Sequence, residues 1–376
     1  MLRIAAVLLG LLLLAGYIGA QSWEATRVLQ DIETGAGPSS LKDRTPEPAR
    51  ETLTLTLETD GGDIAADLYH PRQDVGARIV LVPGFTPQGK DDRRLVQLAN
   101  TLARARFLVL VPDLQGTKDL SVRREDATAI RDAAALLSRL NVERAADEQD
   151  VGVAAISYAV GLAVLATLTP EGEEAIDFLV GIGGYYDTEN VITFSTTGAY
   201  REPGSDRWQT RTPNPLAKWI FLRGNLHMLD NREDREILDE IAHRRMADPN
   251  APITDVADDL GDAGRSLLAL ILNDDQERVP QLLDDLPTSA QEAIEMMSLA
   301  DRDLSHLSNG AILIHGRADT MIPHTESERL ARAIGETDLH LIHGFSHIDP
   351  QGVGLIGQWQ LVRAMMDLLA RRQDGS

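Results

Sequence analysis

The chain has 376 residues, 43% of them hydrophobic, so it is long enough for one large core domain or for a core with an insertion. Its formal net charge is −22 at pH 7, which makes it a poor candidate for binding nucleic acid. It contains no cysteine, and this excludes disulfides, thiolate nucleophiles and thiolate zinc sites.

The N-terminus carries an uncharged apolar run, residues 4–20, directly after Arg3. The run approaches the about 17–25 residues that span a bilayer, so residues 1–22 predict a signal-anchor or a cleaved signal peptide. Ile18 stands where cleavage favours a small residue, which favours the anchor. No basic excess follows the run, so we expect the protein body on the periplasmic side of the membrane, or secreted if cleaved. Residues 23–50 contain clusters of Gly, Pro and Ser and predict a linker.

The body begins with a β-hairpin and continues with strands that alternate with helices. Alternating residues predict the hairpin from 52–58 and 64–69, and continuous apolar runs predict buried strands at 78–83, 107–112, 151–156, 178–182, 311–315 and 339–343. Helical patterns follow most of these strands. This rhythm predicts an α/β fold with a mainly parallel, twisted sheet and helices on both faces.

The strand rhythm stops between residues 190 and 305. Patterns such as those at 237–241 and 267–272 favour helices, and the stretch from Asp230 to Asp303 holds 20 Asp and Glu against 7 Arg. We therefore expect a helical insertion with a solvated acidic face. It would divide a core made of residues 51–189 and 306–376.

Ser157 lies in the pattern Ala155-Ile-Ser-Tyr-Ala159, between an apolar strand and an apolar helix. Presenting a serine at a strand tip requires a sharp, strained turn with small residues on both sides, and the following helix N-terminus favours developing negative charge. The pentapeptide alone fits a nucleophile and an ordinary strand–helix junction equally well.

Two later strand ends favour the nucleophile. Asp319 follows the strand at 311–315, and His347 follows the strand at 339–343. Serine hydrolysis needs an imidazole to take the hydroxyl proton and a carboxylate to orient that imidazole. Carboxyl ends of parallel strands lie at one edge of a sheet, so the three groups are expected to meet.

These motifs together resemble the α/β-hydrolase superfamily, over about residues 52–369. The order Ser, Asp, His, the serine elbow, Gly316-x-x-Asp319 and Gly344-Phe-x-His347 all match it. The resemblance implies a catalytic triad of Ser157, Asp319 and His347, an oxyanion hole from the amides of Phe85 and Tyr158, and a helical lid at 190–305. The stretches 156–159, 183–187 and 194–198 suggest a bacterial branch of unassigned substrate.

Two alternatives to this triad are open in the sequence: a different acidic residue, and a metal site. Asp187 also follows a strand and is the second candidate for the acid. His340, His343 and His347 are close in sequence, but Gly344 interrupts any helix and the glutamate of a helical zinc motif is missing, so no metal is expected. No cofactor is implied either.

The sequence therefore predicts a serine hydrolase with an acyl-enzyme intermediate, acting on a small-molecule carboxylic ester. A thioesterase, a peptidase-like acyl hydrolase and a membrane-tethered, non-catalytic binding protein of the same fold remain the alternatives.

Overall fold

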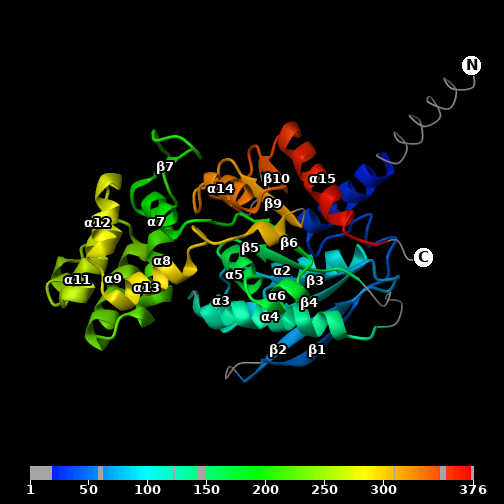
Figure 1. Ribbon diagram of the computed structural model, residues 1–376, viewed down its shortest axis with the longest axis horizontal. Coiled ribbons are helices and arrows are strands. Elements are labelled where there is room, and N and C mark those ends of the chain that lie inside the picture. Colours follow the sequence, from blue (N-terminus) through cyan, green and yellow to red (C-terminus); the bar gives the residue numbers. More distant parts are fainter. Residues whose placement is uncertain are drawn as a thin grey trace, which may run out of the picture.

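The computed structural model describes residues 19–57, 62–121, 123–142, 149–308, 310–347 and 353–373. Within them, a mixed sheet has the strand order β1-β2-β4-β3-β5-β6-β9-β10 (Figure 1). The strands are β1 (Ala49–Thr56), β2 (Asp63–His70), β3 (Ala77–Val82), β4 (Phe107–Pro112), β5 (Val151–Ile156), β6 (Phe178–Ile182), β9 (Ala311–Gly316) and β10 (Thr337–Ile342). β1 and β2 form the predicted antiparallel hairpin, β2 pairs antiparallel with β4, and the other neighbours are parallel.

Helices cover both faces of the sheet because its central strands are apolar on both sides. In β3, Val80 and Val82 pack in one hydrophobic cluster, whereas Ile79 and Leu81 pack in another. The first cluster includes side chains from α4 (Arg124–Arg139), α5 (Ala159–Ala166), α6 (Pro170–Ala175) and α14 (Thr325–Ile334). The second includes α2 (Arg93–Arg104) and α15 (Leu355–Leu369). A short helix, α3 (Gln115–Asp119), follows β4. The predicted α/β architecture is confirmed.

The prediction of a linker at residues 23–50 is wrong for its first part. Residues 19–34 are helical, and Ala25 and Val28 are fully buried in the second cluster. Glu24 forms an ion pair with Arg372, 2.8 Å apart, near the other end of the chain. The apolar positions recur at helical spacing, so this segment is an amphipathic helix that packs on the core.

The Gly-, Pro- and Ser-containing residues after this helix are also held in place. Asp31 is buried, and its carboxylate accepts hydrogen bonds from Ser39 and from Thr101 of α2, the latter at 2.6 Å. Lys42 lies 3.1 Å from the same carboxylate. A buried carboxylate with several donors fixes the chain around it, so the composition that predicted a linker here belongs to an ordered loop.

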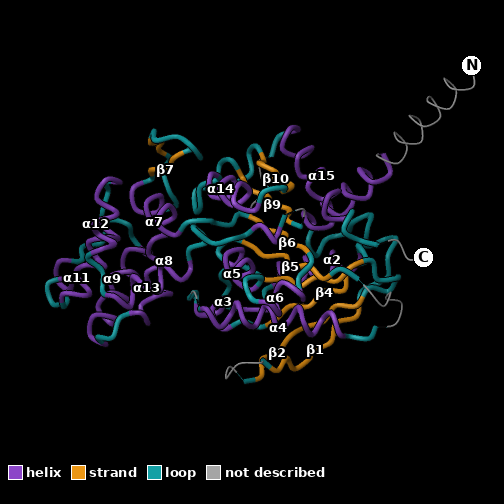
Figure 2. The backbone as a smooth tube through the Cα atoms, in the orientation of Figure 1, coloured by secondary structure: helices purple, strands orange, loops and turns teal. Residues whose placement is uncertain are grey.

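A mostly helical segment separates β6 from β9. We call residues 188–307 the inserted segment; its helices are α7 (Thr188–Thr197), α8 (Ala217–Asn225), α9 (Arg232–Ala247), α10 (Thr254–Ala257), α11 (Asp262–Leu272), α12 (Val279–Asp284) and α13 (Thr288–Met297). Figure 2 shows these helices grouped at the left, beyond the strands of the main sheet. They enclose a cluster of their own that includes Trp219, Leu238 and Ile241.

The inserted segment also contains a small hairpin, β7 (Ala199–Arg201) paired with β8 (Trp208–Thr210), where the sequence predicts only helices. Strands of three residues are too short to show the alternation that identifies a strand.

No helix of the described residues is long and apolar enough to span a membrane. The apolar run at 4–20 lies almost wholly in residues 1–18, outside the described part. The signal-anchor and its consequence for localisation therefore stay predictions.

Candidate active site

Ser157 occupies the sharp turn between β5 and α5. Its φ is +60°, a left-handed conformation that is costly for a residue with a side chain. Its amide donates a 2.7 Å hydrogen bond to the carbonyl of Ile182 at the end of β6. The turn thus holds the serine at the carboxyl edge of the sheet.

Small residues surround this turn, for the reason expected from the sequence. Ala155 and Ala159, which flank the serine by two positions, are fully buried. Gly84 lies so close that a Cβ added there would be 3.3 Å from the Cβ of Ser157. Larger side chains would push the turn away from the neighbouring strands.

His347 connects Ser157 to Asp319. Its Nε2 atom lies 2.8 Å from Ser157 Oγ, and its Nδ1 atom lies 2.7 Å from Asp319 Oδ2. An ionised carboxylate only accepts hydrogen bonds, so Nδ1 carries the proton. Nε2 is then free to accept the hydroxyl proton of Ser157.

Asp319 is fully buried in the loop between β9 and α14. Its Oδ1 atom accepts hydrogen bonds from the amides of Met321 and Ile322, at 2.7 and 3.1 Å. Burial alone would raise the pKa of Asp319, but hydrogen bonds from His315 and His347 outweigh it and hold the pKa well below its usual range. Asp319 is therefore charged at neutral pH.

His315 is a second histidine on Asp319, and it is not among the site residues predicted from the sequence. Its Nε2 atom lies 3.3 Å from Asp319 Oδ2 and 3.1 Å from the carbonyl of Ile322, so it donates towards both acceptors. Its Nδ1 atom then accepts from Ser327 Oγ at 2.7 Å. The one signal in the sequence was its place in β9, four residues before Asp319.

Asp187, the second candidate for the acid, does not contact His347. Its carboxylate accepts a 2.9 Å hydrogen bond from the amide of Glu189 and caps the N-terminus of α7. The part of this loop that approaches the histidine is Gly183, where an added Cβ would lie 3.5 Å from His347 Nδ1. The structure thus brings Asp319, and not Asp187, to the imidazole.

Glu326 holds the loop that contains Asp187. This residue of α14 is fully buried, and its Oε2 atom accepts hydrogen bonds from the amides of Tyr186 and Asp187, at 3.1 and 2.8 Å. Burial raises the pKa of Glu326 to about 7, against the opposing effect of these amides. Burial also raises the pKa of Asp187.

The amides of Phe85 and Tyr158 belong to the two loops that meet at Ser157. Phe85 follows Gly84, which packs on the serine, and Tyr158 follows the serine directly. Among the described residues, neither amide forms a hydrogen bond within the protein. Their aromatic rings stack with centroids 3.8 Å apart, which fixes the two loops against each other.

A cavity of about 120 Å³ adjoins Ser157, with walls from the core and from the inserted segment. The core contributes Phe85, Ser157, Tyr158, Tyr185, Met321 and Ile322, and the inserted segment contributes Thr188, Val191, Ile192, Ser195, Ala217, Ile220, Phe221, Asn225, Met228, Ala293, Ile294 and Met297. Most of these side chains are apolar, and none is charged. The cavity suits an uncharged, largely hydrophobic group next to the serine hydroxyl.

The three histidines considered as a metal site in the sequence do not converge on one another. His340 Nε2 bonds to Asp367 at 2.8 Å, His343 Nδ1 lies 3.2 Å from Gln360, and His347 belongs to the site above. Within the described residues, the group with metal-binding geometry is a different one: Glu202, His324 and Glu328.

Comparisons with known proteins support the fold. No family model and no curated protein matches the chain. Among solved structures, it resembles the acylaminoacyl peptidase of Pyrococcus horikoshii with a TM-score of 0.50 and 12% identity, over 89% of this chain and 43% of that one. It also resembles the α/β hydrolase GrgF from Penicillium sp. sh18, with a TM-score of 0.49 and 16% identity, over 86% of this chain and 99% of that one. An esterase of Pyrobaculum calidifontis matches with a TM-score of 0.46 and 16% identity, over 94% of this chain and 90% of that one.

The protein has the α/β-hydrolase fold, as the sequence predicted. The chain spans less than half the length of the archaeal peptidase that it matches.

The raised pKa of Glu326 predicts a pH-dependent stability. The folded state keeps the proton below about pH 7, whereas the unfolded chain loses it above its ordinary pKa of 4.5, so stability falls as pH rises between these values. The fall is worth about 3 kcal/mol at most. Glu326→Gln, which accepts the same two amide hydrogen bonds without a charge, should reduce this fall, as measured by urea unfolding at pH 5 and pH 8.

The exposed Glu336, just beyond the same helix, provides the control. Glu336→Gln should leave the difference between the two pH values as in the wild type. If Glu326→Gln showed the same difference in unfolding free energy between pH 5 and pH 8 as the wild type, the raised pKa of Glu326 would not be its cause.

Proposed function

We propose that this protein is a serine hydrolase that cleaves a carboxylic ester through an acyl-enzyme intermediate. The observation that carries the proposal is the continuous hydrogen-bonded chain from Ser157 through His347 to Asp319, which opens into an apolar cavity. A structural role alone would not require a serine in a left-handed conformation at the cavity wall.

In the first half of the reaction, His347 Nε2 takes the hydroxyl proton while Ser157 Oγ attacks the carbonyl carbon of the ester. Buried, ionised Asp319 stabilises the imidazolium that results. His347 then gives the proton to the departing alcohol oxygen as the bond from carbon to that oxygen breaks. The acyl group remains on Ser157.

In the second half, His347 takes a proton from a water molecule whose oxygen attacks the acyl carbon. The bond to Ser157 Oγ breaks, and His347 returns the proton to the serine. A carboxylic acid leaves. No atom or electron is needed beyond those of the ester and one water.

The amides of Phe85 and Tyr158 are our candidates for the oxyanion hole. They lie on the two loops that meet at Ser157, and neither is committed to another acceptor among the described residues. Each such donor contributes about 3 kcal/mol of transition-state stabilisation in comparable sites.

The cavity supports an ester with a hydrophobic acyl group. Its wall has no charged side chain, and its polar groups are aliphatic hydroxyls, two phenols and one amide. A smaller cavity of about 30 Å³ shares Ile192, Phe221 and Ile294 with it and leads further into the inserted segment. We propose that the inserted segment acts as a lid that holds the acyl chain. A thioester or an amide would be cleaved by the same steps. Comparing the rates for ester, thioester and amide substrates distinguishes these three activities.

The nucleophile and base are tested by labelling and kinetics. A fluorophosphonate probe should label the wild type and not Ser157→Ala. His347→Ala should lower kcat for a p-nitrophenyl ester by about 10⁴-fold, because no group then takes the serine proton. Equal labelling of wild type and Ser157→Ala would show that the protein is not a serine hydrolase acting through this residue, and near-normal turnover by His347→Ala would contradict the base.

The acid is tested by two matched substitutions. Asp319→Asn should lower kcat by about 10⁴-fold, because the amide no longer selects the tautomer in which Nε2 accepts. Asp187→Asn makes the same chemical change at a partly exposed residue that does not contact His347, and it should retain most of the wild-type kcat. The reverse result would assign the acid to Asp187.

The acyl site is tested by narrowing the cavity. Ile294→Trp should lower kcat/KM for octanoyl esters by at least about tenfold and spare acetyl esters, because the indole occupies space needed by the longer chain. Met296→Trp on the same helix, at a position outside the cavity wall, is the control. If Ile294→Trp lost activity equally for all chain lengths, the acyl group would not bind in this cavity. The bond cleaved is identified separately, with a p-nitrophenyl ester series run beside thioester and anilide substrates.

A further inference from the structure

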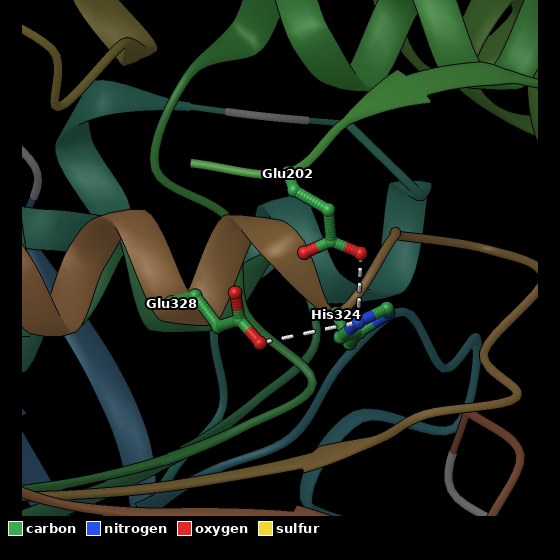
Figure 3. A group of neighbouring side chains, drawn as sticks. All are labelled: Glu202, His324 and Glu328. Atoms are coloured by element: carbon green, nitrogen blue, oxygen red, sulfur yellow. Dashed lines mark ion pairs between the residues drawn. The ribbon is translucent and has the colours of Figure 1, made fainter. Parts of the chain in front are cut away.

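Glu202, His324 and Glu328 converge at a second place in the molecule, outside the cavity wall (Figure 3). Glu202 follows β7 in the hairpin of the inserted segment, His324 directly precedes α14, and Glu328 lies one turn further along α14. His324 Nε2 is 3.9 Å from Glu202 Oε1 and 4.0 Å from Glu328 Oε1. Two elements of the chain thus direct three metal-ligand side chains to one point.

His324 is the unusual member of this group. It is 3% exposed, and neither ring nitrogen has a hydrogen-bond partner among the described residues. A buried polar group without a partner is destabilising, so proteins seldom leave one in that state. The ring of Tyr200 packs edge-on against the imidazole, 6.2 Å between centroids. His324 is therefore held with Nε2 towards the two carboxylates and without a hydrogen bond to either.

An ordinary ion pair does not explain the group. Burial lowers the pKa of His324 to about 4, so the imidazole is neutral at pH 7 and carries a free lone pair. Burial and the nearby charge of Glu202 raise the pKa of Glu328. Among the described residues, neither Glu202 nor Glu328 forms an ion pair with a Lys or an Arg. The group within ion-pair distance of both carboxylates is the neutral imidazole of His324. Arg317 and Arg332 lower the pKa of Glu328 in part, but only from beyond ion-pair distance. Among the described residues, no cation therefore lies directly between the two carboxylates and the imidazole.

We propose that Glu202, His324 and Glu328 bind a divalent transition-metal ion, with zinc as the best fit. One imidazole nitrogen and two carboxylate oxygens are zinc ligands, and a water molecule would complete a tetrahedron. Calcium and magnesium prefer oxygen ligands alone, so the imidazole disfavours them. Ligands of a tetrahedral zinc lie about 3.3 Å apart. The three ligand atoms now lie within 4.8 Å of one another, so they would close by at most about 1.5 Å on binding.

The role of this ion is structural. It joins the β7–β8 hairpin of the inserted segment to the start of α14, and the loop before α14 carries Asp319. Arg211, just after β8, already donates a 3.0 Å hydrogen bond to the carbonyl of Asp319. Binding would therefore fix the inserted segment to the loop that positions Asp319. The metal site does not depend on the proposed hydrolase activity.

The test uses the full chain, freed of metal with a chelator and titrated with Zn²⁺ by calorimetry in excess Mg²⁺, which occupies non-specific acidic sites. The wild type should bind one zinc ion and unfold at a higher temperature with zinc. Glu202→Gln/Glu328→Gln should weaken binding at least about 100-fold and lose the zinc-dependent rise in Tm.

The control removes two carboxylates that lie away from this cluster, on α13 of the inserted segment. Glu292 and Glu295 lie exposed on α13, so Glu292→Gln/Glu295→Gln makes the same charge change and should bind zinc like the wild type. Co²⁺ in place of Zn²⁺ should give visible absorption bands in the wild type and in this control only. The proposal would be overturned if the wild type bound no zinc saturably, or if all three proteins bound it equally. A proton shared between the carboxylates of Glu202 and Glu328 would then explain the cluster.

Discussion

The left-handed conformation of Ser157 is the constraint on which the site depends. Such a conformation costs about 1–2 kcal/mol, and it persists only where the surroundings enforce it. Here β5 is paired with β3 on one side and β6 on the other, and the serine amide bonds to Ile182 at the end of β6. The turn therefore has no room to relax. The same sheet positions the loops after β9 and β10, which bring Asp319 and His347 to the serine hydroxyl.

Much of this arrangement could be predicted from the sequence because it is encoded locally. Continuous apolar runs identified the buried strands, and small residues around Ser157 identified the sharp turn. Asp319 and His347 were singled out because each follows such a strand, and the parallel order of the sheet makes strand ends meet. The contact of His315 with Asp319 could not be found in this way. It depends on the rotation of one side chain within a buried strand, which no pattern in the sequence records.

Other features were missed because long-range packing overrides local composition. The Gly, Pro and Ser content of residues 23–50 predicted a linker, yet Ala25 and Val28 pack on the core and Asp31 binds Thr101. Ala25, Val28, Leu29 and Ile32 do recur at helical spacing, but the Gly, Pro and Ser residues that follow them dominate the composition of the stretch. Glu202 and His324 are likewise far apart in the sequence, on elements whose approach is set by the tertiary fold.

The cavity and the catalytic geometry that we propose share one support, the loop from Gly183 to Thr188. At its start, Gly183 lies against the ring of His347. Further along the loop, Tyr185 Oη and Thr188 Oγ1 donate to the carbonyls of Met297 and Ile294 on α13, at 3.0 and 3.1 Å. Glu326 fixes the middle of the loop through two amides. A displacement of α13 therefore acts on the same short segment that limits the position of the imidazole, so the inserted segment constrains the site as well as enclosing it.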